Sequence, residues 1–221
     1  MKWVFTQFSY KVNGFILFCN LLAYTFLKSF FFSSERLIFV VKKVVVFYKK
    51  NKVMMETIKI SDEALRKGAE EGMDGFLQVF IDKYLEVTGG EINASTMPLL
   101  NGHQHTLLGY HFLREELNVG GFVQLIQNGY GPYIFDNPFA KAMRLFGLKE
   151  FSKLIYAAKK IYDENKADLE KERDDDAFMA MYEEYEEFDD LEEKFMEMEE
   201  YVTAKLAEYV DEHLELFAEV V

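Results

Sequence analysis

The feature that most constrains the fold is a helical stripe of apolar residues near the C-terminus, inside the acid-rich stretch MYEEYEEFDDLEEKFMEMEEY and its continuation. At 100° per residue these side chains fall within about 120° of a helix circumference. They are Phe188, Leu191, Phe195, Met198, Val202, Leu206, Tyr209, Val210, His213 and Phe217. Acids fall on the opposite side: Glu186, Asp189, Asp190, Glu193, Glu197 and Glu200. The pattern predicts a long helix that buries one edge and holds carboxylates toward water.

Helix signals recur along the rest of the chain after residue 60. Ser61 precedes two acids and predicts an N-cap, Gly89 and Gly90 predict a helix end, and Asn101 predicts a second N-cap. The whole chain has only three prolines, and no segment of this part alternates convincingly with the period of a strand. We therefore expect an all-α fold, as a single compact multi-helix domain with a long acidic C-terminal helix.

Three turns are expected between these helices. Gly120 and Gly121 should end the helix that begins after Asn101, and NGYGPYIFDNP should form a loop. Asn137 before Pro138 predicts the N-cap of a further helix that Gly147 ends. A helix with one apolar face should follow in LKEFSKLIYAAKKIYDENKADL.

The charge divides the chain into two unlike parts. Residues 1–53 hold nine Lys/Arg and one acid, a net charge of +8, whereas the remaining 16 basic and 37 acidic residues give −21. A part this acidic repels phosphate backbones, so we expect it to bind no nucleic acid directly. Attraction to basic partners is expected instead.

Residues 1–53 are an apolar, basic extension with two interpretations. Their bias toward Phe and Lys is typical of translated noncoding sequence, with Met54 or Met55 as the true start and residues 55–221 as the acidic domain. Alternatively, the apolar residues 12–27 form a membrane anchor or an uncleaved signal. The extension should be poorly structured or a lone apolar helix. We expect a cytoplasmic protein, because the single Cys19 fits a reducing compartment, with membrane anchoring as the alternative.

One cluster of residues allows a metal-dependent enzyme as a lesser alternative. His103 and His105 precede His111 and Glu115, which stand four residues apart on one predicted helix face. A surface histidine pair explains the same pattern. No nucleophile with a histidine partner is evident, so we expect no catalytic residues, no metal and no cofactor.

The stretch LNGHQHTLLGYHFLREELNVGGFVQLIQNGYG, followed by AMRLFGLKEFSKLIYAA, resembles the DNA-mimic protein family. The motif that carries the resemblance comprises Glu116, Asn118, Gly120, Gly121, Phe122, Gln124, Asn128, Gly129 and Gly147. The resemblance covers roughly sixty residues and leaves the acidic tail outside. It implies a compact, acidic, all-α domain, and in one branch of the family carboxylates stand in for DNA phosphates and a dimer occupies a transcription factor. Without the family, the two glycines are expected to allow a tight backbone turn before Phe122 fills the core.

The acidic tail can be compared with DNA by its charge density. From Asp163 to Glu200 there are nineteen acids and four bases, a net charge of −15 over 38 residues. One continuous helix of that length is about 57 Å long, which gives one net charge per ~3.8 Å, against one per ~3.4 Å on a DNA strand. The density permits mimicry, although a solubilising role explains it equally.

The expected partner is a basic DNA-binding protein, contacted by nine carboxylates. These are Glu183, Glu184, Glu186, Glu187, Asp189, Asp190, Glu193, Glu197 and Glu200. Their expected role is steering and contact rather than catalysis. The alternative is a helical interaction or inhibitor module whose partner does not bind DNA.

Overall fold

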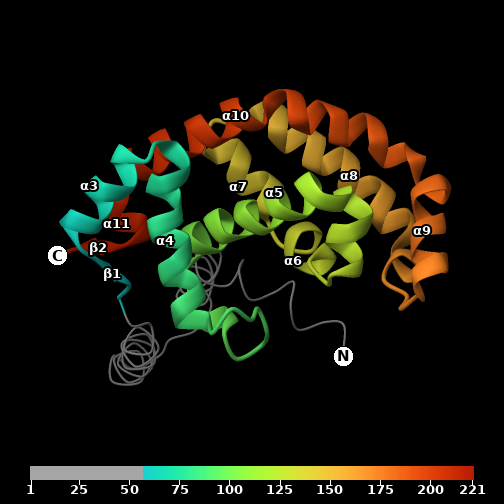
Figure 1. Ribbon diagram of the computed structural model, residues 1–221, viewed down its shortest axis with the longest axis horizontal. Coiled ribbons are helices and arrows are strands. Elements are labelled where there is room, and N and C mark those ends of the chain that lie inside the picture. Colours follow the sequence, from blue (N-terminus) through green and yellow to red (C-terminus); the bar gives the residue numbers. More distant parts are fainter. Residues whose placement is uncertain (1–56) are drawn as a thin grey trace, which may run out of the picture. The chain divides into compact units, whose positions relative to one another are not determined.

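The computed structural model describes residues 57–221, and the hypotheses about residues 1–53, the span 12–27 and a start at Met55 concern residues outside that range. The described elements confirm the all-α class (Figure 1). In chain order they are β1 Lys59–Ile60, α3 Asp62–Glu70, α4 Met73–Thr88, η1 Met97–Leu99, α5 Gly102–Gln127, α6 Gly131–Phe135, α7 Phe139–Leu145, α8 Lys149–Leu169, α9 Asp175–Glu184, η2 Glu186–Phe188, α10 Asp189–Glu212, α11 Leu214–Phe217 and β2 Glu219–Val220. Among residues 57–221, no helix combines the length and the apolarity that a bilayer crossing requires.

A two-residue strand pair joins the two ends of the described chain. β1 and β2 pair in parallel, with Lys59 opposite Glu219 and Ile60 opposite Val220. The N–H of Glu219 donates to the carbonyl of Ile58 at 2.8 Å. Sequence periodicity did not predict this pair, because two residues are too few to alternate.

Two predicted helix starts are confirmed and a third is wrong. The Ser61 hydroxyl accepts from the N–H of Ala64 at 3.2 Å, and Asn101 and Gln104 form a reciprocal capping box. Asn137 is not an N-cap: Pro138 holds that position, and the Asn137 side chain donates to the carbonyl of Tyr133 at 3.0 Å. It does so because the predicted loop contains α6, whose C-terminal carbonyls need donors.

The core is built around α5, which contacts α4, α7, α8, α10 and α11. In Figure 1, α8 and α10 run side by side in opposite directions across α5. Aromatic pairs join the layers: the ring centroids of Phe122 and Phe188 lie 5.2 Å apart, and those of Phe151 and Phe195 lie 6.0 Å apart. The predicted apolar stripe is confirmed, since all of its ten residues are buried or half-buried. The single helix predicted to carry it is wrong, because the chain leaves the helical conformation at His213 and the stripe runs over η2, α10 and α11.

The prediction of one continuous acidic helix from Asp163 to Glu200 is wrong. The chain leaves α8 after Leu169, starts α9 at Asp175, passes through η2 and starts α10 at Asp189. Asp174 begins α9 as an N-cap, accepting from the N–H of Ala177 at 2.9 Å. Leu169, Met181 and Phe188 are all buried, so each of these segments directs an apolar residue of its own into the core.

Candidate functional site

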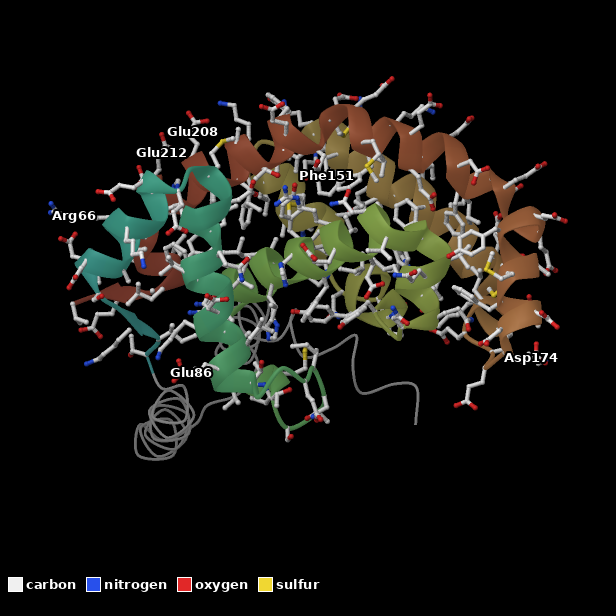
Figure 2. All side chains as sticks on the ribbon, viewed as in Figure 1. Arg66, Glu86, Phe151, Asp174, Glu208 and Glu212 are labelled. Atoms are coloured by element: carbon white, nitrogen blue, oxygen red, sulfur yellow. The ribbon has the colours of Figure 1, made fainter. Side chains whose placement is uncertain are left out.

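The candidate functional site is an exposed set of carboxylates on α9, η2 and α10, here called the acidic surface. It comprises Glu183, Glu184, Glu186, Glu187, Asp189, Asp190, Glu193, Glu197 and Glu200. All nine are solvent-exposed, and none makes an ion pair or a side-chain hydrogen bond with another described residue. Figure 2 shows oxygen-tipped side chains lining the outer edge from Asp174 to Glu208 and Glu212. Each of the nine predicted residues is therefore open to solvent.

The acidic surface has little opposing charge of its own. Between Glu183 and Glu200 there are eleven acids and one base, Lys194, which is exposed and lies on α10. Large apolar side chains are exposed on the same two helices: Met179 is 62% exposed, Tyr201 is 60% exposed and Met196 is 44% exposed. The surface thus offers strong negative charge together with some apolar contact area.

Two acids of α10, Glu199 and Glu192, face inward and were not among the predicted site residues. The Glu199 carboxylate accepts from Nε of Arg114, and Nη1 of the same guanidinium donates to the carboxylate of Asp74 on α4. Close by, the Tyr110 hydroxyl and the Thr203 hydroxyl are 2.6 Å apart. These contacts join α4, α5 and α10 behind the acidic surface. Their sequence signal is the helical wheel, on which Glu199 falls at about 20° from the first residue of the buried stripe, inside that stripe, and Thr203 at about 60°, at its edge.

The second inward acid, Glu192, caps a break in α5. Gly120 and Gly121 leave the helical conformation, with φ of +68° at Gly121, and the freed N–H of Phe122 donates to the Glu192 carboxylate at 2.7 Å. Burial raises the pKa of Glu192, while the hydrogen bond from Phe122 acts in the opposite direction. A Cβ atom at position 121 would overlap this carboxylate. The expected tight turn before a buried Phe122 is confirmed.

The break in α5 has a second partner from the acidic helices. The Tyr182 hydroxyl of α9 donates to the carbonyl of Gly120 at 3.0 Å. Beside the break, Glu116 accepts from Gln124 at 2.9 Å and from Asn128 at 2.8 Å. Much of the motif that resembles the DNA-mimic family therefore forms one local network that holds the fold.

The alternative metal ligands are dispersed. His105 uses both ring nitrogens, with Tyr133 Oη at 2.9 Å and the Met97 carbonyl at 2.8 Å, and burial lowers its pKa. His103 instead stacks on Phe146, with ring centroids 5.8 Å apart. Within residues 57–221, no three His, Cys, Asp or Glu side chains are grouped so that they could hold a metal ion.

The other two candidate metal ligands, His111 and Glu115, line a small cavity together with Asp74 and Arg114. Its volume is about 40 Å³, which leaves room for little more than a water molecule.

Comparison with known proteins assigns the family. A family model described as DMP19-like protein matches residues 98–213. The DNA mimic protein DMP19 of Neisseria meningitidis serogroup B (strain ATCC BAA-335 / MC58) is 32% identical over 145 residues, which cover 65% of this chain and 87% of that relative. The match extends well beyond the sixty residues recognised in the sequence and includes the α5 break and the acidic surface. The chain therefore belongs to the family of DMP19-like proteins.

Proposed function

We propose that this protein is cytoplasmic and that its residues 57–221 are a non-enzymatic DNA mimic, which occupies the DNA-binding surface of a basic protein such as a transcription factor. The observation that carries the proposal is the acidic surface, nine exposed carboxylates without a described partner on a member of this family. The name of the Neisseria relative supports the same role.

The physical basis is that unpaired carboxylates can replace phosphates as partners of Lys and Arg. Arginine and lysine pair with carboxylate and phosphate oxygens through the same charge-assisted hydrogen bonds. A single-sign field also raises the rate of encounter with an oppositely charged surface. Because the acids of this surface are not paired within the described fold, a basic partner need not first break ion pairs to reach them.

The net charge per unit length of α10 is lower than that of the predicted continuous helix from Asp163 to Glu200. From Asp189 to Glu200, α10 carries five exposed acids and one exposed base over twelve residues, about 18 Å of helix. One net charge per ~4.5 Å resembles a single DNA strand, at one per ~3.4 Å, more than a duplex, at one per ~1.7 Å. The proposal therefore concerns contacts along one backbone strand.

A helical interaction module with a partner that does not bind DNA is the second candidate. The exposed Met179, Met196 and Tyr201 favour it, because methionine and tyrosine suit apolar protein interfaces. The two candidates differ in salt dependence. Contacts between charged groups weaken as salt screens them, whereas apolar contacts persist.

The test is capture of partners by the purified protein, followed by affinity measurement with each identified partner. We expect a basic DNA-binding protein that duplex DNA displaces and that binds far more weakly as salt rises. The quadruple variant Glu187→Gln, Glu193→Gln, Glu197→Gln, Glu200→Gln should bind at least about tenfold more weakly. The control variant Glu63→Gln, Glu70→Gln, Glu71→Gln, Glu215→Gln removes the same charge from other exposed positions and should bind nearly as tightly as the wild type.

Two results would contradict the proposal. Equal loss of affinity in the two quadruple variants would mean that only the total charge matters. Binding that resists 0.5 M salt and duplex DNA would instead favour the interaction module.

A further inference from the structure

The break in α5 leaves backbone groups that the helix itself does not use. Gly120 and Gly121 are non-helical, so the helix that begins at Phe122 starts with a free N–H, and the carbonyl of Gly120 is free on the other side. A helix start of this kind attracts a negative side chain. Here the groups that satisfy the break come from distant parts of the chain.

Both partners of the break belong to the helices that carry the acidic surface. Tyr182 of α9 donates to the Gly120 carbonyl at 3.0 Å, and Glu192 of α10 accepts from the Phe122 N–H at 2.7 Å. We call Gly120, Gly121, Phe122, Tyr182 and Glu192 the clasp. One break in α5 thus binds α9 and α10 at once.

We propose that the clasp is a positioning device for partner binding, in which Tyr182 and Glu192 fix the directions in which α9 and α10 present their carboxylates. This inference rests on the proposed function, and it assigns to Glu192 a role different from that of the nine exposed acids. Glu192 positions the surface and does not touch the partner.

Apolar burial alone does not fix the directions of α9 and of the first turn of α10. α9 fully buries only Met181 within its own span, α10 fully buries no residue before Phe195, and hydrophobic burial has no preferred direction. Consecutive residues of a helix differ by 100°, so a modest rotation of α9 would turn Glu183 or Glu184 away from the surface. A hydrogen bond has a preferred angle and a short range, so it removes this freedom.

Substitutions in the clasp can remove a charge and a hydrogen bond separately. A glutamine at position 192 removes the negative charge and keeps an oxygen that can accept from Phe122, whereas an alanine removes both. Phenylalanine at position 182 removes only the hydroxyl and leaves the net charge unchanged. Tyr201 provides a control for that change, because it is exposed on α10 and its hydroxyl makes no hydrogen bond to another described residue.

The experiment compares four variants of the full chain: Glu192→Ala, Glu192→Gln, Tyr182→Phe and Tyr201→Phe. Affinity for the basic partner is measured well below the unfolding temperature of each variant, and amide hydrogen exchange is measured without a partner. We expect Glu192→Gln and Tyr201→Phe to bind within about twofold of the wild type, and Glu192→Ala and Tyr182→Phe to bind about five- to tenfold more weakly, the size of one lost hydrogen bond. Exchange of the Phe122 amide and of residues 183–200 should rise only in the two weakened variants.

Equal affinities of Glu192→Ala and Glu192→Gln, with equal exchange in residues 183–200, would overturn the inference, because the two variants carry the same charge. The proposed function fails by a separate result, namely that the wild type binds no basic DNA-binding protein. In that case the exchange data still decide whether the clasp orders α9 and α10.

Discussion

Replacing Gly121 by alanine tests the geometry at the centre of the fold. Gly121 has φ of +68° and ψ of −162°, a region of backbone conformation that is open almost only to glycine. The added methyl group would also occupy the space of the Glu192 carboxylate. The substitution therefore strains the backbone and displaces the acceptor of the Phe122 N–H.

The two effects can be added from typical magnitudes. Backbone strain in this region costs about 1–3 kcal/mol, and a donor left without an acceptor costs about 1–3 kcal/mol. We expect Gly121→Ala to lower the free energy of unfolding by about 2–6 kcal/mol, measured by urea denaturation of the purified protein. Gly129→Ala is the matched control, because Gly129 also has positive φ, at +86°, but nothing lies within 4 Å of its added Cβ atom.

A double variant identifies the source of the loss. In a Glu192→Ala background the methyl group no longer meets a carboxylate and the Phe122 N–H already lacks its acceptor. Gly121→Ala should then cost about as much as Gly129→Ala, a coupling of about 1–3 kcal/mol between positions 121 and 192. If Gly121→Ala and Gly129→Ala are equally destabilising in the wild-type background, the contact with Glu192 is not the reason that position 121 requires glycine.

Two further changes give separate tests. Asn101→Ala removes the capping box of α5 and also the side-chain donor that lies 2.9 Å from the Leu216 carbonyl. It should therefore lower the free energy of unfolding by about 2 kcal/mol. Ser61→Ala removes only an exposed cap and should cost less, as urea denaturation of both variants would measure. Because burial raises the pKa of Glu192, the folded state favours its protonated form, and ionisation as pH rises through that pKa costs stability. The Glu192→Gln variant should therefore have the same free energy of unfolding as the wild type near pH 4 and a larger one near pH 7. If the wild type instead becomes more stable relative to the variant as pH rises, the pKa of Glu192 is not raised in the folded state.

Local signals in the sequence predicted local structure well. The stripe from Phe188 to Phe217 was readable because every helical residue repeats the same geometry. The caps at Ser61 and Asn101 were readable because their partners lie within three residues. The break between α8 and α9 had a readable signal in Asp174, an N-cap residue before further acids, but the surrounding acids suit a continuous helix equally.

Contacts across the chain could not be predicted in this way. Phe122 and Glu192 are 70 residues apart, and Arg114 and Glu199 are 85 apart. On a helical wheel Glu192 falls at about 40° from the first residue of the stripe, level with the buried Val210, so its inward direction was readable from the stripe. Its partner was not readable, because the N–H of Phe122 that it accepts from lies in another helix.

The distribution of the basic residues bears on whether the acidic surface serves only solubility. In α8, five bases and four acids are interspersed, and Lys153, Lys159 and Lys160 each pair with an acid three or four residues away. Such mixing of both signs is enough to hydrate the exposed face of a helix. The segment from Glu183 to Glu200 has eleven acids and one base. Mutual repulsion among these acids costs stability, and hydration alone does not require it, so this asymmetry supports a surface that a basic partner neutralises.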